Sequence, residues 1–364
     1  MCGQTLAHKT PLIADMRALM GSRCAAVFDE AGRHSDESVV QRIADLARRV
    51  HADGLIAVGA GTVIMTVRLV AIVLAESRPV DELVTVYDEQ ARVARSPRLD
   101  APKLPIINVL TAATNAQNRA GSAMRRDGAG RRLEMFDPKT RPSSIYWDAR
   151  ALMTAPASLA AATGLTTFWW SFMTLGGIAQ CNPLVQADRL HAFSLARRAL
   201  PRMGGNDPAS RLEMCAASFL QNRDEDAGGS PFEVHWVFRV CYALGSGIFT
   251  SNDALHPGHV YACLTGPAIA NFAQRNLAEI RSMCQAIAPE HAASLAAAEP
   301  AELAQVARSF LVRHGAPARL RDLGIPRDQL IAIREFALRN FNADRRRELR
   351  HVVPLLDRTL EEAW

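Results

Sequence analysis

The chain has 364 residues, of which 49% are hydrophobic and 22% charged, so it is long enough for one large or two ordinary globular domains and too apolar to be disordered. Lysine and arginine exceed aspartate and glutamate by 42 to 37, and the short basic clusters are mixed with acids and lack interleaved aromatic residues. This pattern argues against a nucleic-acid-binding protein and leaves a mild preference for anionic ligands.

The seven cysteines are an odd number, widely spread, without a CxxC pair or zinc-like spacing. Such cysteines are typical of reduced thiols in a cytosolic protein. The N-terminal stretch lacks the apolar core of a signal peptide, and no stretch has the length of charge-free apolar residues needed to span a bilayer. We therefore expect a soluble, cytoplasmic protein with no membrane contact.

The first part of the chain predicts alternating helices and strands. A short helix is expected over residues 11–20 and a strand over 24–28. Residues 38–50 have the apolar spacing of an amphipathic helix, and 55–58 form a short apolar run typical of a buried strand. This alternation indicates a parallel sheet covered by helices.

The strand at 55–58 ends in a glycine turn, and a helix is expected from Val63 onward. The turn consists of Gly59, Ala60, Gly61 and Thr62. Backbone N–H groups at such a helix start, together with the helix dipole, would favour a bound phosphate. An ordinary structural turn tolerates two glycines equally well, so both interpretations stay open here.

The next elements extend the sheet. A strand is expected over 104–110, followed by a polar loop over 111–121, a hairpin-like turn over 128–132 and a strand over 144–147. Beyond residue 156 the composition changes to alanine- and leucine-rich segments with helical spacing. These segments are 159–175, 184–200, 210–222, 232–244, 258–272, 276–288, 301–314 and a final pair ending at 362. The expected domains are an α/β domain over 1–150 and an all-helical domain over 151–364.

Six segments, in order, share motifs with one family. The stretch around the glycine turn is similar to a strand followed by G-G-G-S-x-x-D, PIINVLTAATNAQ to P-T-T-A-G-T-G-S-E, and HWVFRVCYALGS to H-H-K-L-C-H-x-L-G-G. The chain thus resembles the iron-dependent (group III) alcohol dehydrogenases, and within them most closely the maleylacetate reductases. The other three segments are WDARALMTAPASLAAATGLTTFWW, CNPLVQADRLHAFSLARRALPRM and HPGHVYACLTGPAIANFAQRN.

The resemblance implies a fold class of α/β plus all-α. Its N-terminal domain would be a Rossmann-like parallel-sheet domain, shortened at the N-terminus relative to the family. Its C-terminal domain would be a helical bundle, as in the dehydroquinate synthase-like or iron alcohol dehydrogenase fold. A cleft between the domains and a homodimer are also implied.

The same resemblance implies a metal bound by one aspartate and three histidines, but none of these ligands is kept. Their positions fall on Thr166, Trp170, Tyr242 and Gly258. A one-residue slip would bring His256 or His259 toward the last position, yet one imidazole does not hold an iron or zinc ion. We therefore expect no catalytic metal, and a substrate pocket lined by Thr166, Trp169 and Trp170.

The resemblance also implies NAD(P)H as a possible cofactor. Its pyrophosphate would lie at the glycine turn, on Gly59, Ala60, Gly61 and Thr62, with Thr111 and Asn115 from the following loop. Three departures put this site in question: Met65 replaces the aspartate, Arg68 replaces the helix lysine, and the loop has lost both glycines.

A second set of candidate residues lies on the segment at 232–244. His235, Arg239 and Tyr242 are spaced i, i+4 and i+7, so a helix would present them on one face. Together they could bind a carboxylate or transfer a proton. The alternative is that Tyr242 and Trp170 are core residues and Arg239 reaches solvent.

His256 and His259 flank a Pro-Gly turn that follows Asp253. One of these imidazoles could serve as a general base oriented by Asp253, or both could be surface histidines at an ordinary helix start. Cys241 is expected to be a core residue, because no sequence feature lowers the pKa of its thiol.

The leading hypothesis is a metal-independent, NAD(P)H-dependent reductase of a small anionic carbonyl or enoate substrate. One alternative is a repurposed non-redox enzyme, such as a lyase, isomerase or hydrolase, that uses the interdomain cleft. Another is a catalytically dead partner subunit that keeps only the fold.

Overall fold

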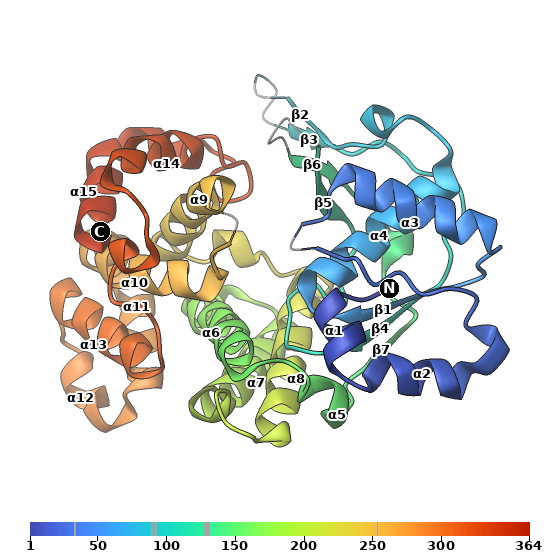
Figure 1. Cartoon of the computed structure of the whole chain (residues 1–364). Coiled ribbons are helices and arrows are strands. Elements are labelled where there is room, and N and C mark those ends of the chain that lie inside the picture. Colours follow the sequence, from blue (N-terminus) through green and yellow to red (C-terminus); the bar gives the residue numbers. More distant parts are fainter. Residues whose placement is uncertain (33, 89, 91–92, 127–131, 253) are drawn as a thin grey trace. The chain divides into compact units, whose positions relative to one another are not determined.

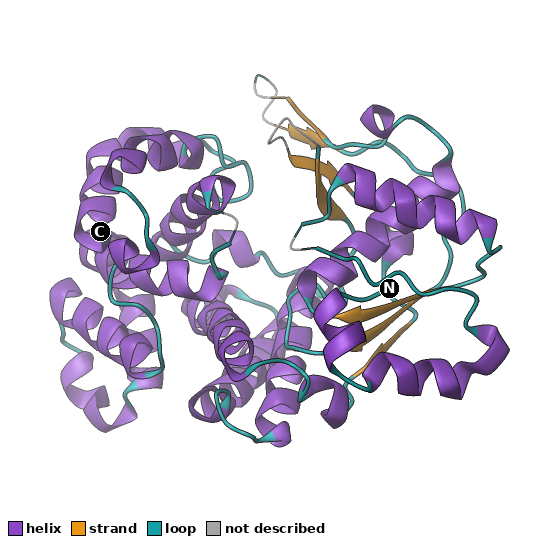
Figure 2. Cartoon of the chain, in the orientation of Figure 1, coloured by secondary structure: helices purple, strands orange, loops and turns teal. Residues whose placement is uncertain are grey.

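A computed structural model of the chain describes all residues except 33, 89, 91–92, 127–131 and 253. The chain forms two compact units, residues 1–156 and 157–364. In the described part of the chain the strands lie in unit 1 and unit 2 is helical (Figure 2). The expected turn at 128–132 falls mostly outside the described residues, as does Asp253.

Unit 1 contains a three-stranded parallel sheet. Its strands are β1 (Leu55–Gly59), β4 (Ile106–Leu110) and β7 (Ser144–Tyr146), in the order β1-β4-β7. Leu55 pairs with Ile106, so β1 and β4 run in register and end at the same edge. All three strands were predicted from the sequence, at 55–58, 104–110 and 144–147, and are confirmed.

Helices cover both faces of this sheet (Figure 1). The side chains of Ile56 and Val58 belong to one core, whereas Leu55 packs into another, as the alternation of a strand requires. The first core includes residues of α1 (Gln4–Lys9), α2 (Leu12–Met20) and α5 (Ala149–Leu152), and the second includes residues of α3 (Glu37–Arg49) and α4 (Gly61–Glu76).

Unit 1 also has two short antiparallel pairs whose strands the sequence analysis did not predict, although it expected a hairpin-like turn at 128–132, between the strands of the second pair. One joins β2 (Val86–Asp88) to β3 (Val93–Arg95), and the other joins β5 (Ser122–Arg125) to β6 (Arg132–Met135). Their strands have only three or four residues, too few to show a clear alternation.

The predicted strand at 24–28 is wrong. No strand is assigned there, although every residue of the segment is described. Instead Cys2 N–H donates to Phe28 O at 2.9 Å, and Val58 N–H donates to Met1 O at 2.9 Å. Because the first residues of the chain lie beside β1, the apolar run at 24–28 does not pair with that strand.

Unit 2 consists of helices that begin where the sequence places capping residues. Asn182 accepts hydrogen bonds from the N–H groups of Leu184 and Val185, and Asp207 accepts one from Ala209; a proline follows each cap. The helices are α6 (Ala157–Thr174), α7 (Pro183–Ala199), α8 (Pro208–Asp226), α9 (Trp236–Ser251), α10 (Pro257–Phe272), α11 (Leu277–Ile287), α12 (Ala292–Leu295), α13 (Pro300–Arg313), α14 (Leu330–Ala337) and α15 (Val353–Ala363).

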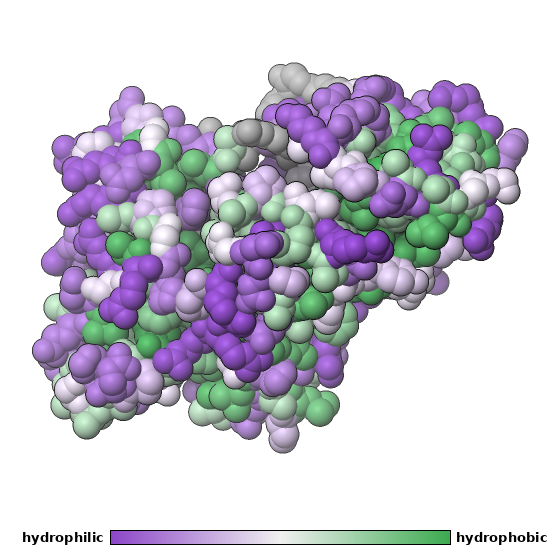
Figure 3. Space-filling view, turned by 60° about the horizontal axis from the view of Figure 1, so that its bottom comes forward, coloured by the Kyte–Doolittle hydropathy of each residue, from purple (hydrophilic) through white to green (hydrophobic). Residues whose placement is uncertain are grey.

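Helix α10 is the central element of unit 2. It is buried along most of its length and packs against α6, α9, α13 and α15. On the face shown in Figure 3, hydrophilic residues cover much of the surface and apolar residues are interspersed among them. None of the helices in the described ranges is both long and apolar enough to cross a membrane.

Candidate functional site

The glycine turn lies at the carboxyl edge of the parallel sheet, as the strand-turn-helix pattern predicts. Thr111 N–H donates to Gly59 O at 3.1 Å, which ties the end of β1 to the loop after β4. Helix α4 begins at Gly61; its N-cap residue, Ala60, provides no side-chain cap, and its first turn contains no acidic residue. The positive end of the helix dipole is therefore not neutralised by those side chains, which favours a bound anion.

Close packing, rather than an unusual backbone conformation, explains the two glycines. Neither has a positive φ. A Cβ on Gly59 would lie 2.8 Å from Cγ2 of Val63, and a Cβ on Gly61 would lie 3.0 Å from Oγ1 of Thr114. A side chain at 59 would therefore push α4 away from the sheet, whereas a side chain at 61 would meet the loop after β4.

The predicted cofactor residues outside the turn lie on this loop, residues 111–121. Thr111 is buried and bonded to Gly59, and Asn115 is half-buried four positions further along. Thr114 Oγ1 accepts a hydrogen bond from Ala116 N–H at 3.1 Å. The structure thus places Thr111 directly on the glycine turn and Asn115 on the same loop.

His235 does not lie on the face of a helix, contrary to the prediction. Its backbone is extended (φ −166°), and it is the N-cap of α9. Nδ1 accepts a hydrogen bond from Phe238 N–H at 3.1 Å, so Nε2 carries the proton and donates to Met173 O at 2.9 Å. Burial lowers the pKa of His235 to about 4. The ring is therefore neutral near pH 7 and holds the start of the helix.

Arg239 is bonded to a distant part of the chain. Its guanidinium donates to Asp344 at 2.9 Å, to Glu348 at 2.7 Å and to Ala343 O at 2.9 Å, and it lies 4.6 Å from the ring centroid of Trp236. Asp344 is buried, so this ion pair is shielded from water. The alternative in which Arg239 simply reaches solvent is wrong.

A cavity of about 180 Å³ adjoins Arg239. Arg345 and Arg346 line it and are exposed, and neither makes an ion pair or side-chain hydrogen bond with the described residues. The remaining lining residues are Glu233, Asn342, Ala343 and Glu348.

Tyr242 belongs to an aromatic cluster with the predicted pocket residues Trp169 and Trp170. The rings of Trp170 and Tyr242 meet edge to face at 5.8 Å, and Trp169 stacks on Tyr261 at 4.1 Å. Trp169 is fully buried, and its Nε1 donates to Thr265 Oγ1 at 2.8 Å. These rings form a packed core with a satisfied indole, which favours the core interpretation of Trp170 and Tyr242.

The four positions that the resemblance assigns to metal ligands are paired with one another. Thr166 Oγ1 accepts a hydrogen bond from Gly258 N–H at 2.9 Å, and Trp170 contacts Tyr242. A Cβ on Gly258 would lie 2.5 Å from the backbone N of Thr166, so α6 and α10 approach too closely for a side chain at 258. In the part of the chain that the structure describes, no three His, Cys, Asp or Glu side chains are grouped to hold a metal ion. The residues present therefore do not fit the family's iron or zinc site.

His256 and His259 lie at the start of α10, with ring centroids 5.8 Å apart. His259 is half-buried, and burial, followed by the neighbouring His256, lowers the pKa of His259. The aspartate expected to orient one of them, Asp253, lies outside the described residues. Burial raises the pKa of the Cys241 thiol, in agreement with its interpretation as core.

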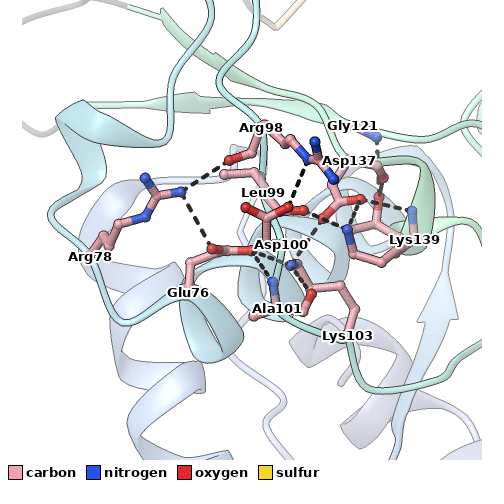
Figure 4. A network of polar contacts seen from close by, with 11 residues as sticks. Glu76, Arg78, Arg98, Leu99, Asp100, Ala101, Lys103, Gly121, Asp137 and Lys139 are labelled. Carbon is pink, nitrogen blue, oxygen red and sulfur yellow. Dashed lines mark hydrogen bonds and ion pairs between the residues drawn. The ribbon is translucent and has the colours of Figure 1, made fainter.

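Sequence reasoning missed a network of buried charges in unit 1 (Figure 4). Lys103 Nζ lies 2.6 Å from Glu76 and 3.0 Å from Asp137, and its side chain is fully buried. Lys139 also pairs with Asp137, at 3.2 Å, and Arg78 with Glu76, at 3.4 Å. Isolated charges next to apolar runs are the only sequence signal for such a network, and they do not reveal its partners.

Comparisons with known proteins agree with the resemblance. Residues 1–149 match the family model of iron-containing alcohol dehydrogenases. A 4-hydroxybutyrate dehydrogenase from Cupriavidus necator is 26% identical over 311 residues, 83% of this chain and 76% of that protein. A maleylacetate reductase from a Rhizobium species is 23% identical over 327 residues, 89% of this chain and 78% of that protein.

Solved structures of alcohol dehydrogenases share the fold of both units, not only that of residues 1–149. The crystal structure of an alcohol dehydrogenase from Oenococcus oeni matches with a TM-score of 0.79 at 17% identity, covering 100% of this chain and 91% of that one. The predicted fold class, a parallel-sheet domain followed by a helical domain, is thereby confirmed. The chain carries the iron-containing alcohol dehydrogenase domain in residues 1–149 and has the fold of that family throughout, as its motifs predict.

Proposed function

We propose that this chain is an NAD(P)H-dependent oxidoreductase that acts, without a catalytic metal, on a small anionic carbonyl or enoate substrate. The glycine turn carries the proposal: the uncapped start of α4 lies at the carboxyl edge of the sheet, where Thr111 N–H joins it to the next loop. Relatives named as a dehydrogenase and a reductase support the reaction class.

NAD(P)H, when bound, supplies a hydride. The role of this chain is to hold the pyrophosphate on the backbone N–H groups at the start of α4, near Gly61 and Thr62. His235 does not serve as a proton donor near pH 7, because its ring is buried, neutral and bonded through both nitrogens. We propose His259 as the proton donor instead, since it is half-buried at the start of α10, next to His256.

Metal independence is supported by the packing of α6 against α10. Gly258 and Thr166 are in direct contact, and Trp170 lies against Tyr242. Three ligands of the kind that iron and zinc require are not available at these positions.

The cavity beside Arg239 supports an anionic substrate. Glu348 is already paired with Arg239, so Arg345 and Arg346 face one unpaired carboxylate, that of Glu233, and the local charge is positive. We propose that these two arginines bind the substrate anion while Arg239 holds the segment that carries them.

Nucleotide binding is the direct test. Purified protein is titrated with NADH and NADPH while tryptophan fluorescence is followed; saturable binding is expected, and absence of binding at millimolar concentration would exclude the reductase. Gly61→Val should abolish binding because its side chain meets Thr114, whereas Gly54→Ala should not, because a Cβ there makes only an ordinary 3.7 Å contact with Pro105.

The arginine pair is tested by kinetics once a substrate is found. Arg345→Ala and Arg346→Ala should each raise KM about tenfold or more with a smaller change in kcat, as expected for loss of a charge-assisted hydrogen bond. Arg197→Ala, at an exposed position on α7, is the control. An unchanged KM in both variants would remove the cavity from the site.

A second candidate is favoured by the aromatic cluster. If the packed rings of Trp169, Trp170 and Tyr242 leave no room for a substrate, the chain is a catalytically silent relative. Nucleotide binding without turnover of any carbonyl or enoate would support this reading.

A further inference from the structure

The loop after β4 is held by a buried arginine. Arg68 is the only charged residue of α4 before Glu76 and is 2% exposed. Its Nη1 donates to Gly121 O at 2.6 Å and its Nη2 donates to Ala116 O, and in the described ranges it makes no ion pair with a carboxylate. Both of its partners lie on loop 111–121, so this cation is dedicated to the loop.

Other elements fix the same segment. Asn108, buried on β4, donates to Gln117 O at 2.8 Å, and Trp147, after β7, donates to Gln117 Oε1 at 2.8 Å. Residues 116–121 are thus bonded to α4 and to residues in or next to both neighbouring strands.

Gly121 is the fixed end of the loop. Its φ is +74°, and a Cβ there would lie 2.7 Å from Met135 O, so only glycine fits. Its N–H donates to Thr140 Oγ1 at 3.3 Å, and Thr140 Oγ1 donates to Asp137 O at 2.8 Å. Figure 4 shows that this chain of bonds continues to Lys103.

The fixed segment determines where Thr114 lies. Thr114 stands between Thr111, bonded to Gly59, and Ala116, bonded to Arg68, and its Oγ1 is the nearest atom to the position of a Cβ on Gly61. A shift of Ala116 would move Thr114, which accepts its N–H, and would alter the wall beside Gly61.

We propose that Arg68 is a positioning residue, which holds loop 111–121 beside the glycine turn through its hydrogen bonds to two loop carbonyls. The claim that Arg68 fixes the loop does not depend on the proposed function, whereas the claim that it affects nucleotide affinity rests on that function. A buried cation without a carboxylate is unfavourable, and burial lowers the pKa of Arg68 to about 9. The two bonds from one rigid guanidinium offset this loss by fixing two carbonyls at a set separation.

Hydrogen–deuterium exchange of the full chain tests the first part. Arg68→Met should raise exchange across loop 111–121 about tenfold or more, because two charge-assisted hydrogen bonds are lost. Arg68→Lys should give a smaller rise, since an ammonium keeps the charge but cannot donate to both carbonyls in the geometry of a guanidinium. This variant also provides the test if Arg68→Met does not fold. Arg211→Met, which removes another buried arginine but in unit 2, should leave this loop unchanged.

Nucleotide titration of the same variants tests the second part. A weaker affinity in Arg68→Met and Arg68→Lys, with Arg211→Met close to wild type, is expected. Unchanged loop exchange in a folded Arg68→Met variant would overturn the inference. If wild-type protein binds no nucleotide but the loop loosens as expected, the proposed function fails and the positioning role remains.

Discussion

Different side chains hold the surroundings of loop 111–121 in unit 1 and the contact of α6 with α9 and α10 in unit 2. In unit 1, buried charged and amide side chains such as Arg68, Asn108 and Lys103 hold loops through hydrogen bonds and ion pairs. In unit 2, aromatic rings pack on one another instead, with Trp169 against Trp170 and Trp170 against Tyr242. At the carboxyl edge of the sheet the start of α4 has no capping side chain, whereas the positions that the resemblance assigns to metal ligands are filled by contacts within the protein.

The difference also concerns how each region resists change. Buried ion pairs lose stability when one partner is removed, because the other is left unpaired in a low dielectric. A packed aromatic core responds instead to volume, since it tolerates neither cavities nor added atoms. Substitutions matched to each mechanism therefore separate the two regions.

The largest effect is expected from Lys103→Met. Removing the ammonium leaves Glu76 and Asp137 buried without it, so the free energy of unfolding of unit 1 should fall by about 3–5 kcal/mol in chemical denaturation. Arg98→Met, which removes an ion pair with Asp100 at a position 91% exposed, should change stability little. Similar losses in both variants would show that the buried network is no more important than a surface pair.

A pH effect of roughly 3 kcal/mol is expected in unit 2. The pKa of His235 is about 4 in the folded chain and 6.5 when free, so the unfolded chain binds a proton that the folded chain excludes between these values. Its contribution to stability is therefore complete above about pH 6.5 and is lost as the pH falls to about 4. Denaturation curves across this range measure it.

His235→Asn is the matched variant for this effect. Asparagine keeps a capping acceptor for the start of α9 but does not titrate, so the pH dependence should flatten. The buried carboxylates of unit 1 titrate at lower pH than this effect. Burial opposes their ionised form, but hydrogen bonds, including those from Lys103, hold the pKa of Glu76 and of Asp137 below the usual value. An unchanged slope in His235→Asn would assign the acid sensitivity elsewhere.

The smallest effect is expected from Gly258→Ala. The added Cβ would meet the backbone of Thr166, so unfolding free energy should fall by about 1–3 kcal/mol. Gly204→Ala, where a Cβ meets nothing within 4 Å, should be neutral or slightly stabilising. Equal melting temperatures for the two variants would mean that α6 and α10 separate easily.

Local pattern was sufficient for most of the fold. The glycine turn with β1 and α4, and the helices of unit 2, follow apolar periodicity and capping residues that neighbouring sequence contains. The apolar run at 24–28 shows the limit, because its partner is Cys2 and not a strand of the sheet. Whether an apolar segment joins a sheet depends on which edge is free, and periodicity does not contain that information.

The candidate site was predicted less well, because its side chains are determined by distant partners. Arg239 is held by Asp344 and Glu348, more than a hundred residues away. His235 has the right spacing for a helix face but precedes the helix as its cap. Arg68 was noted in the sequence as the residue in place of a helix lysine, and its carbonyl partners on loop 111–121 have no sequence signature.

The contact between Gly258 and Thr166 limits which side chains this part of the chain can accept. A side chain at 258 requires the backbones of α6 and α10 to separate, since a Cβ would lie 2.5 Å from the Thr166 nitrogen. Substituting histidine there, and the other ligands at Thr166, Trp170 and Tyr242, would therefore first disrupt a helix crossing before it created a binding site. A single ligand placed at 258 would therefore destabilise the contact of α6 with α10 before a complete ligand set was present.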